Sequence, residues 1–201
     1  MNFTYYVEDG KNILDISGKG IVPAGKFANN KFIEELHISG DITFIGEDAF
    51  ANCPNLKAVY LWTYVLHGIG RQAFANCPIS ELVINSHVPY MIHSRAFVGC
   101  ALKELFLSGF TYRIGHSAFG FCKNLEVVRL RNGVNTISYG AFTNCYKLHT
   151  VELYDTIVTL KDDAFECCNI KTVHLLHDKD APDYDTLFKG ATIDNKEMPF
   201  V

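Results

Sequence analysis

The dipeptide Ala-Phe recurs along most of the 201-residue chain at a nearly constant spacing. It ends at Phe50, Phe74, Phe97, Phe119, Phe142 and Phe165, with gaps of 24, 23, 22, 23 and 23 residues. Steps of 23 residues outward reach Phe27 and Phe188, which gives eight registers. A unit this short cannot bury its own apolar face, whereas stacked copies bury it together, so the period predicts a solenoid.

Each Phe is followed, five or six residues later, by an apolar frame of the form L-x-x-L-x-L. The last two apolar positions alternate with outward positions, as a half-buried strand requires. The frames are Ile33-Leu36-Ile38, Leu56-Val59-Leu61, Ile79-Leu82-Ile84, Leu102-Leu105-Leu107, Leu125-Val128-Leu130, Leu148-Val151-Leu153 and Ile170-Val173-Leu175. One such strand per unit predicts a parallel sheet, with the Phe side chains stacked inside as a ladder.

Between each frame and the next Phe lies a second extended stretch, such as "DITFIG" or "FTYRIG". We expect it to begin the convex side and to lead into a tight helical turn at "xxAFxxC". The segment is too short for a continuous long helix. The fold class expected is therefore an α/β solenoid of about eight units, with one parallel sheet on the concave face and short helical turns and extended segments on the convex side.

The two ends of the chain differ from its middle, as the caps of a solenoid must. Asp9-Gly10 lies between two strand-like runs and predicts a hairpin that covers the N-terminal edge. At the other end Phe188 keeps the register, but the frame is lost after Ile193. We expect a single structural domain with an N-terminal capping hairpin at 1–20, tandem repeats at 21–177 and a degenerate C-terminal cap at 178–201.

The pattern I-x-x-x-A-F-x-x-C-x-x-L-x-x-L-x-L resembles the BspA-like class of leucine-rich repeats. It is carried by "IGEDAFANCPNLKAVYL", "IGHSAFGFCKNLEVVRL" and "ISYGAFTNCYKLHTVEL". The resemblance covers roughly residues 20–195 and implies a right-handed curved superhelix. It also implies a surface or secreted protein that adheres to host proteins or other cells. This chain lacks the Pro that often follows the strand in this class, and no signal peptide is visible at its N-terminus.

Six cysteines follow their Phe by three residues, namely Cys53, Cys77, Cys100, Cys122, Cys145 and Cys168. Free Cys is a small and easily buried side chain, so we interpret this slot as a row of buried thiols. Disulfides between stacked neighbours and a metal or nucleophilic role are the alternatives, although seven cysteines is an odd number. Cys167, Cys168, His174 and His177 match no standard four-ligand zinc spacing.

Composition and motifs together exclude several classes of function. Lys and Arg number 18 against 22 Asp and Glu, without a basic cluster, so no nucleic-acid partner is expected. No apolar run reaches the length of a membrane span, so no membrane insertion is expected. The chain has no G-x-S-x-G, no H-E-x-x-H and no Gly-rich phosphate loop. We therefore expect a protein that is not an enzyme and that uses no cofactor and no metal.

The outward positions of the frames are the part of the sequence left free for binding. An apolar, aromatic group lies in the N-terminal half and a charged group follows it; the candidate partner-binding residues are Tyr60, Trp62, Val83, Phe106, Arg129, Arg131, Glu152 and Tyr154. Exposed aromatic and Arg side chains are typical of protein interfaces. Neighbouring aromatics also stabilise a sheet by packing on one another, so a purely structural role is the competing interpretation.

The sequence thus predicts a monomeric, protein-binding leucine-rich-repeat module, with a role in adhesion or host interaction suggested by the resemblance. A glycan-binding module and a structural spacer without a ligand are the alternatives, because aromatic faces such as that of Trp62 also suit sugars. Location stays open between the cell surface, which the resemblance implies, and the cytoplasm, which reduced cysteines and the N-terminal sequence favour.

Overall fold

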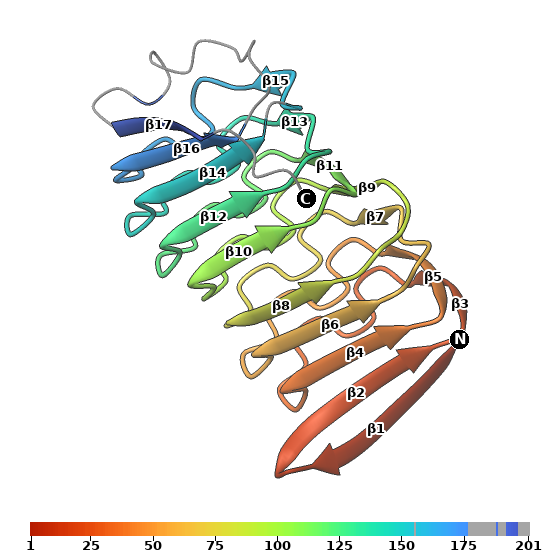
Figure 1. The fold of residues 1–201 in the computed structure, drawn as a ribbon. Helices are drawn as coiled ribbons and strands as arrows, with labels where there is room; N and C mark the ends of the chain where they lie inside the picture. Colours follow the sequence, from red (N-terminus) through yellow and green to blue (C-terminus); the bar gives the residue numbers. More distant parts are fainter. Residues whose placement is uncertain (155, 177–187, 189–191, 197–201) are drawn as a thin grey trace.

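The structure of the protein is a computed structural model that describes residues 1–154, 156–176, 188 and 192–196. Over these residues the chain winds through about seven turns of a solenoid that is built from strands and contains no helix (Figure 1). The α/β class and the helical turns expected from the sequence are therefore wrong. The expected stack of short repeats with parallel strands is present.

One face of the solenoid carries the strands formed by the apolar frames, which we name the frame strands. They form two sheets of five strands each, in the orders β1-β2-β4-β6-β8 and β10-β12-β14-β16-β17. Their bounds are β1 Asn2–Glu8, β2 Lys11–Ser17, β4 Glu35–Ser39, β6 Ala58–Trp62, β8 Glu81–Ile84, β10 Glu104–Leu107, β12 Val127–Leu130, β14 Thr150–Tyr154, β16 Thr172–Leu176 and β17 Thr192–Lys196. All the pairs are parallel except β1 with β2.

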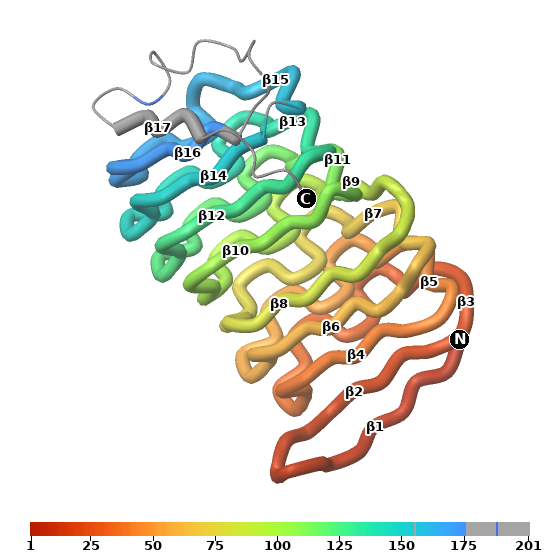
Figure 2. The backbone as a smooth tube through the Cα atoms, viewed as in Figure 1, coloured from red at the N-terminus to blue at the C-terminus, as the bar shows by residue number. Residues whose placement is uncertain are grey.

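The second extended stretch of each unit forms a sheet of its own on the other side of the interior. Its seven parallel strands run in the order β15-β13-β11-β9-β7-β5-β3. They are β3 Lys19–Val22, β5 Asp41–Ile45, β7 Gly68–Ile69, β9 Tyr90–Ile92, β11 Thr111–Ile114, β13 Thr136–Ile137 and β15 Thr159–Leu160. The tube in Figure 2 follows one coil after another from β3 to β15. The extended segments expected after the frames are thus confirmed as strands.

The corner around each Ala-Phe is not helical because its backbone alternates between right- and left-handed conformations. The residue two positions after each Phe has a positive φ in all seven units: Asn29, Asn52, Asn76, Gly99, Phe121, Asn144 and Cys167. In the unit of Phe50, the amides of Asp48, Phe50 and Asn52 donate to carbonyls of the following turn at 2.8–2.9 Å. These N–H groups point along the solenoid, so they are not available for the hydrogen bonds of a helix.

The frame sheet is interrupted between β8 and β10, where a single sheet was expected. Just before the paired strands β6 and β8, the amide of Ser80 donates a hydrogen bond to the carbonyl of Lys57, and just before β10 and β12 the amide of Glu126 donates to the carbonyl of Lys103. No described hydrogen bond or strand pairing links β8 to β10. At this step the amide of Ala101 instead donates to Ile79 O at 2.9 Å. As a result Leu82 and Ile84 of β8 are only half-buried, whereas the matching side chains of β4 and β6 are fully buried.

The Phe side chains form the interior ladder that their spacing predicts. From Phe27 to Phe165, neighbouring ring centroids lie 5.1–5.6 Å apart, with interplanar angles of 10° or less. The stack is closed at its ends by non-parallel rings, because Phe3 meets Phe27 edge-on and Phe188 is tilted by 49° against Phe165. These rings join the frames into one continuous apolar core.

The cysteines of the repeated slot are free thiols with a common hydrogen-bond partner. Each Sγ donates to the backbone carbonyl of the Phe in the preceding turn, at 3.0–3.5 Å. Five of the six are buried, and Cys168 is half-buried. The slot therefore selects a side chain that is both small and able to donate.

The N-terminal hairpin consists of β1 and β2 with a turn at Asp9-Gly10, both of whose residues have positive φ. That conformation matches the type I′ turn of two-residue hairpins. At the other end, β17 pairs in parallel with β16, while most of residues 178–201 lies outside the described residues. The division into caps and repeats at residues 20 and 177 stays a prediction, as does the right-handed curvature.

Candidate interaction surface

The eight candidate residues lie on or next to frame strands. Tyr60 and Val83 are register partners on β6 and β8, and Phe106, Arg129 and Glu152 form one row across β10, β12 and β14. Trp62 and Tyr154 end β6 and β14, and Arg131 directly follows β12. Three apolar side chains of this set are well exposed: Trp62 at 44%, Val83 at 39% and Phe106 at 55%.

Three rings cluster around β4 and β6, and we name His37, Tyr60 and Trp62 the aromatic cluster. Tyr60 and Trp62 stack with centroids 5.4 Å apart, and His37 meets them at 5.3 and 5.4 Å. Burial, together with the neighbouring Glu81 carboxylate, raises the pKa of Tyr60 to about 12. The candidate set omitted His37, although it shares the outward column of Tyr60.

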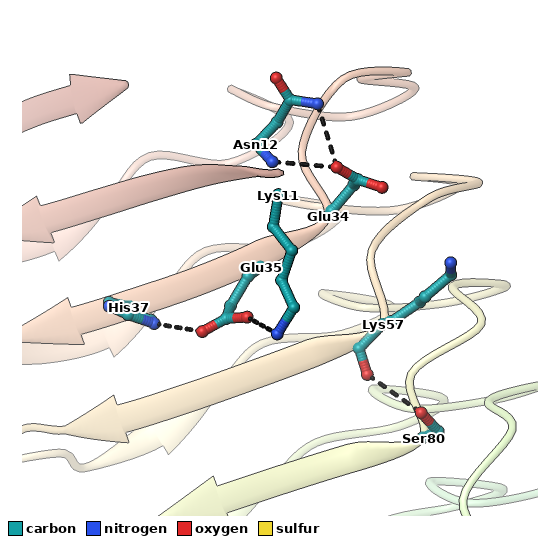
Figure 3. A network of polar contacts seen from close by, with 7 residues as sticks. All are labelled: Lys11, Asn12, Glu34, Glu35, His37, Lys57 and Ser80. Carbon is teal, nitrogen blue, oxygen red and sulfur yellow. Dashed lines mark hydrogen bonds and ion pairs between the residues drawn. The ribbon is translucent and has the colours of Figure 1, made fainter. Parts of the chain in front are cut away.

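A buried carboxylate holds His37 in place at the edge of the aromatic cluster. Glu35 lies 2.8 Å from His37 Nε2 and 3.0 Å from Lys11 Nζ (Figure 3). Burial alone would raise the pKa of Glu35, but the hydrogen bonds from His37 and Lys11 outweigh it and lower that pKa. Glu35 is therefore ionised at neutral pH, and His37 is oriented by a charged partner. Beside Glu35, the carboxylate of Glu34 accepts hydrogen bonds from the backbone N and the side-chain Nδ2 of Asn12, at 2.9 and 3.0 Å.

A second group, which we name the charged cluster, joins the candidate residues of β10, β12 and β14. Arg129 donates to Glu104 at 2.6 Å and to Glu152 at 3.1 Å, and these carboxylates raise the pKa of Arg129. Arg131 donates to the Tyr154 hydroxyl at 2.7 Å. The members of the charged cluster are Glu104, Phe106, Arg129, Arg131, Glu152 and Tyr154.

The Arg131 guanidinium also covers two rings of the charged cluster. It lies 5.2 Å from the centroid of Phe106 and 5.8 Å from that of Tyr154. Both contacts are within the range of a cation–π interaction. Arg129, by contrast, has its guanidinium committed to two carboxylates, so its first role is to tie three strands together.

The interruption of the frame sheet separates the two clusters. Val83 and Phe106 were expected in adjacent rows, but their strands β8 and β10 do not pair. The candidate surface thus consists of an aromatic cluster on one sheet and a charged cluster on the next. Sequence periodicity could not show this, because the frames of β8 and β10 keep the same 23-residue offset.

A hollow of about 710 Å³ lies at the loop edge, away from this surface. The loops after Phe74 and Phe97 are one residue shorter than those after Phe50 and Phe119, and the flanking loops wall the hollow with Pro54 and Phe121. Cys77 and Cys100 also line it. Burial raises the pKa of the Cys100 thiol, which makes a reactive thiolate unfavourable there.

The described part of the chain places no three His, Cys, Asp or Glu side chains together as a metal site. Cys167 is exposed, while Cys168 Sγ donates to Phe142 O. His174 lies on β16 opposite Glu152, and His177 falls outside the described residues. Among the residues that the structure describes, no helix is long and apolar enough to cross a membrane.

The chain matches the model of a protein family. The family described as the BspA type leucine-rich repeat region fits the chain in six copies, over residues 20–93 and 67–190. A comparison with curated proteins gives no match.

Solved structures of bacterial leucine-rich repeat proteins share the fold. The pneumococcal vaccine antigen PcpA is 16% identical over 96% of this chain and 44% of its own, with a TM-score of 0.57. A leucine-rich repeat protein of Bacteroides ovatus is 22% identical over 89% and 52%, with a TM-score of 0.52. The T. pallidum leucine-rich repeat protein is 20% identical over 86% and 82%, with a TM-score of 0.56. The chain thus spans about half the length of the first two.

Proposed function

This chain belongs to the BspA-type leucine-rich repeat family, and from that premise we propose that it binds a protein partner on the outward face of its frame strands. Leucine-rich repeat proteins of this kind are typically interaction proteins. The observation that carries the proposal is the exposure of Trp62, Val83 and Phe106 on this face, while the frames and Phe rings fill the interior.

The two clusters supply the kinds of side chain that dominate protein interfaces. Trp, Tyr and Arg are enriched among the residues that contribute most to binding energy. The stacked Tyr60 and Trp62 rings are held by His37, so they lose little freedom when a partner binds. Arg131 keeps Phe106 and Tyr154 in a fixed arrangement in the same way.

Adhesion to a host protein at the cell surface is the finer form of this proposal. It is supported by the family and by the likeness in fold to PcpA, which is itself a vaccine antigen. The family and the solenoid fold are typical of proteins that are not enzymes. We accordingly assign no catalytic residue, cofactor or metal ligand.

The proposal is tested by capture of partners with the double variant Trp62→Ala/Phe106→Ala. The bait is the full chain, exposed to lysate of the native host and to host-cell surfaces. We expect the double variant to lose the captured protein, because the two aromatic members of the three exposed apolar side chains are removed. Its melting temperature should fall by only a few degrees, since Trp62 keeps 44% and Phe106 55% of its surface exposed and neither side chain belongs to the interior core.

The matched control is Phe32→Ala/Tyr146→Ala, which removes two exposed aromatic side chains in the loops after Phe27 and Phe142. This control should capture the partner as the wild type does. If the Trp62/Phe106 variant still captures the partner, the surface is structural. Retention on a glycan array without any captured protein would instead identify a sugar-binding module.

A further inference from the structure

The N-terminal strand β1 is an aromatic edge strand that no other described strand covers. It ends the first frame sheet and pairs only with β2 (Figure 1). All seven of its residues, Asn2 to Glu8, are exposed. It contains no Pro and no bulge, two of the devices that keep an edge strand from pairing with another chain, and its one charged residue, Glu8, lies at the turn end.

The hairpin geometry determines which backbone groups of β1 are free. The turn is flanked by the pair Glu8–Lys11, and in a two-residue hairpin that pair exchanges both backbone hydrogen bonds. Along the hairpin, pairs that exchange backbone hydrogen bonds alternate with pairs that exchange none, and the pairs of Phe3, Tyr5 and Val7 with β2 are of the second kind. The N–H and C=O groups of Phe3, Tyr5 and Val7 therefore point away from β2, toward the open edge.

The same three residues carry an apolar surface on the core side of the hairpin. Phe3 caps the Phe ladder by meeting Phe27 edge-on at 5.4 Å. Tyr5 and Val7 share its side of the strand, because side chains alternate. They have no such cover: Tyr5 is 56% exposed and Val7 is 68% exposed.

We propose that β1 pairs antiparallel with β1 of a second copy of this chain, in a register centred on Tyr5. Tyr5 then faces Tyr5 of the second copy, and Phe3 faces Val7. All three residues with free backbone groups form hydrogen-bonded pairs, and each exposed apolar side chain meets another. A shift by two residues in either direction leaves one of the three without a strand partner.

The charges around the strand favour a second copy in the antiparallel direction. The turn end of β1 carries the carboxylates of Glu8 and Asp9, while Lys11, opposite Glu8, is paired with the buried Glu35 at 3.0 Å. At the other end the Lys26 ammonium lies over the Phe3 ring, 4.8 Å from its centroid. An antiparallel pair brings the acidic end of one copy to Lys26 of the other, whereas a parallel pair sets like charges side by side.

This pairing joins two frame sheets into one continuous sheet across a two-fold axis. Such an interface is isologous and closed, so it gives a dimer and not a fibre. It leaves the aromatic and charged clusters of both copies on outward faces. The dimer therefore adds a second binding surface, and it replaces the expectation of a monomer without depending on the proposed function.

Disulfide capture tests the register directly. Hydrogen-bonded antiparallel pairs have Cα atoms about 5.5 Å apart, within the range a disulfide spans. In a Cys167→Ser background, which removes the exposed native thiol, Tyr5→Cys should give a disulfide-linked dimer on mild oxidation. A mixture of Phe3→Cys and Val7→Cys chains should likewise cross-link preferentially to each other.

The matched control is Tyr64→Cys, because Tyr64 has the same exposed fraction of 56%. It should stay largely monomeric under the same oxidation. Sedimentation should also show that the dimer formed by the wild type is lost in Tyr5→Lys, because this change places two ammonium groups opposite each other at the two-fold axis. The dimer should be kept in the control Tyr64→Lys. Equal cross-linking of Tyr5→Cys and Tyr64→Cys, or a wild type that is monomeric at every concentration, would overturn the proposal.

Discussion

The thiol of Cys77 donates a hydrogen bond to the backbone carbonyl of Phe50 in the preceding turn, with Sγ and O 3.0 Å apart. The same relationship holds at all six positions of the slot. The repeated Cys is thus more than a small apolar side chain, because it also links each turn to the one before it. This accounts for a thiol at a position where an apolar side chain of similar size could not donate the hydrogen bond.

The donor role of the thiol predicts the order of two substitutions at Cys122. Cys122→Ala should lower the free energy of unfolding by about 1–3 kcal/mol, since it removes the bond to Phe97 O and leaves a small cavity. Cys122→Ser keeps a donor and should cost less. Urea unfolding measures both, and a Ser variant that is less stable than the Ala variant would mean that the slot is selected for apolarity alone.

The Phe ladder predicts a steep dependence of stability on position. Phe97 is fully buried between parallel rings on both sides, so Phe97→Ala should cost about 3–5 kcal/mol. Phe165 is only half-buried, and Phe165→Ala should cost clearly less. Phe110→Ala, at an exposed ring outside the ladder, is the control. Similar losses for all three variants in chemical unfolding would show that the ladder does not carry the stability.

The left-handed corner predicts a stabilising substitution at Phe121. This exposed Phe has a φ of 59°, at a position where four other units have Asn. Bulky residues are strained in this conformation by about 1–2 kcal/mol, whereas Asn tolerates it. Phe121→Asn should therefore raise the melting temperature, and the reciprocal Asn144→Phe should lower it. A drop in melting temperature for Phe121→Asn would show that the ring makes contacts worth more than the strain.

The environment of Tyr60 predicts a pH dependence in the alkaline range. Its pKa is raised to about 12 in the folded protein, against an ordinary value of about 10. Between these values the folded chain holds a proton that the unfolded chain has lost, so the free energy of unfolding falls as pH rises. Tyr60→Phe should weaken this fall. Glu81→Gln should shift the tyrosinate absorbance of Tyr60 to lower pH, and an unchanged titration would contradict the assigned role of Glu81.

The sequence predicts the stacked parts of this fold and misses its corners. The positions of Phe50, Cys53 and the strand frame repeat because each copy contacts its own equivalent in the next turn, so periodicity alone places them inside. A tight helical turn is expected at stretches such as "DAFANC", although Asp, Phe, Asn and Cys are weak helix formers. Instead the backbone of this stretch alternates between right- and left-handed conformations, because its amides donate hydrogen bonds to the next turn. The recurring Asn52, Asn76 and Asn144 were the sequence signal that could have indicated a left-handed backbone.

The candidate surface is predictable in outline for the same reason. Alternation along the strands is enough to place Trp62 and Phe106 on the outward face. It cannot show that Arg129 is committed to Glu104 and Glu152, because those contacts depend on rotamers and not on period. Nor can it show the interruption between β8 and β10, where backbone pairing fails although the frames match.

The most direct test of the central claim is to place a photo-reactive phenylalanine analogue at position 62 and to identify what it cross-links. The claim is that apolar side chains in the interior hold the turns together and that the outward face of the frame strands binds a protein. We expect irradiation to link position 62 to one defined protein, and the same probe at position 146 to link to none. Equal labelling from both positions, or a partner captured only from position 146, would contradict the account.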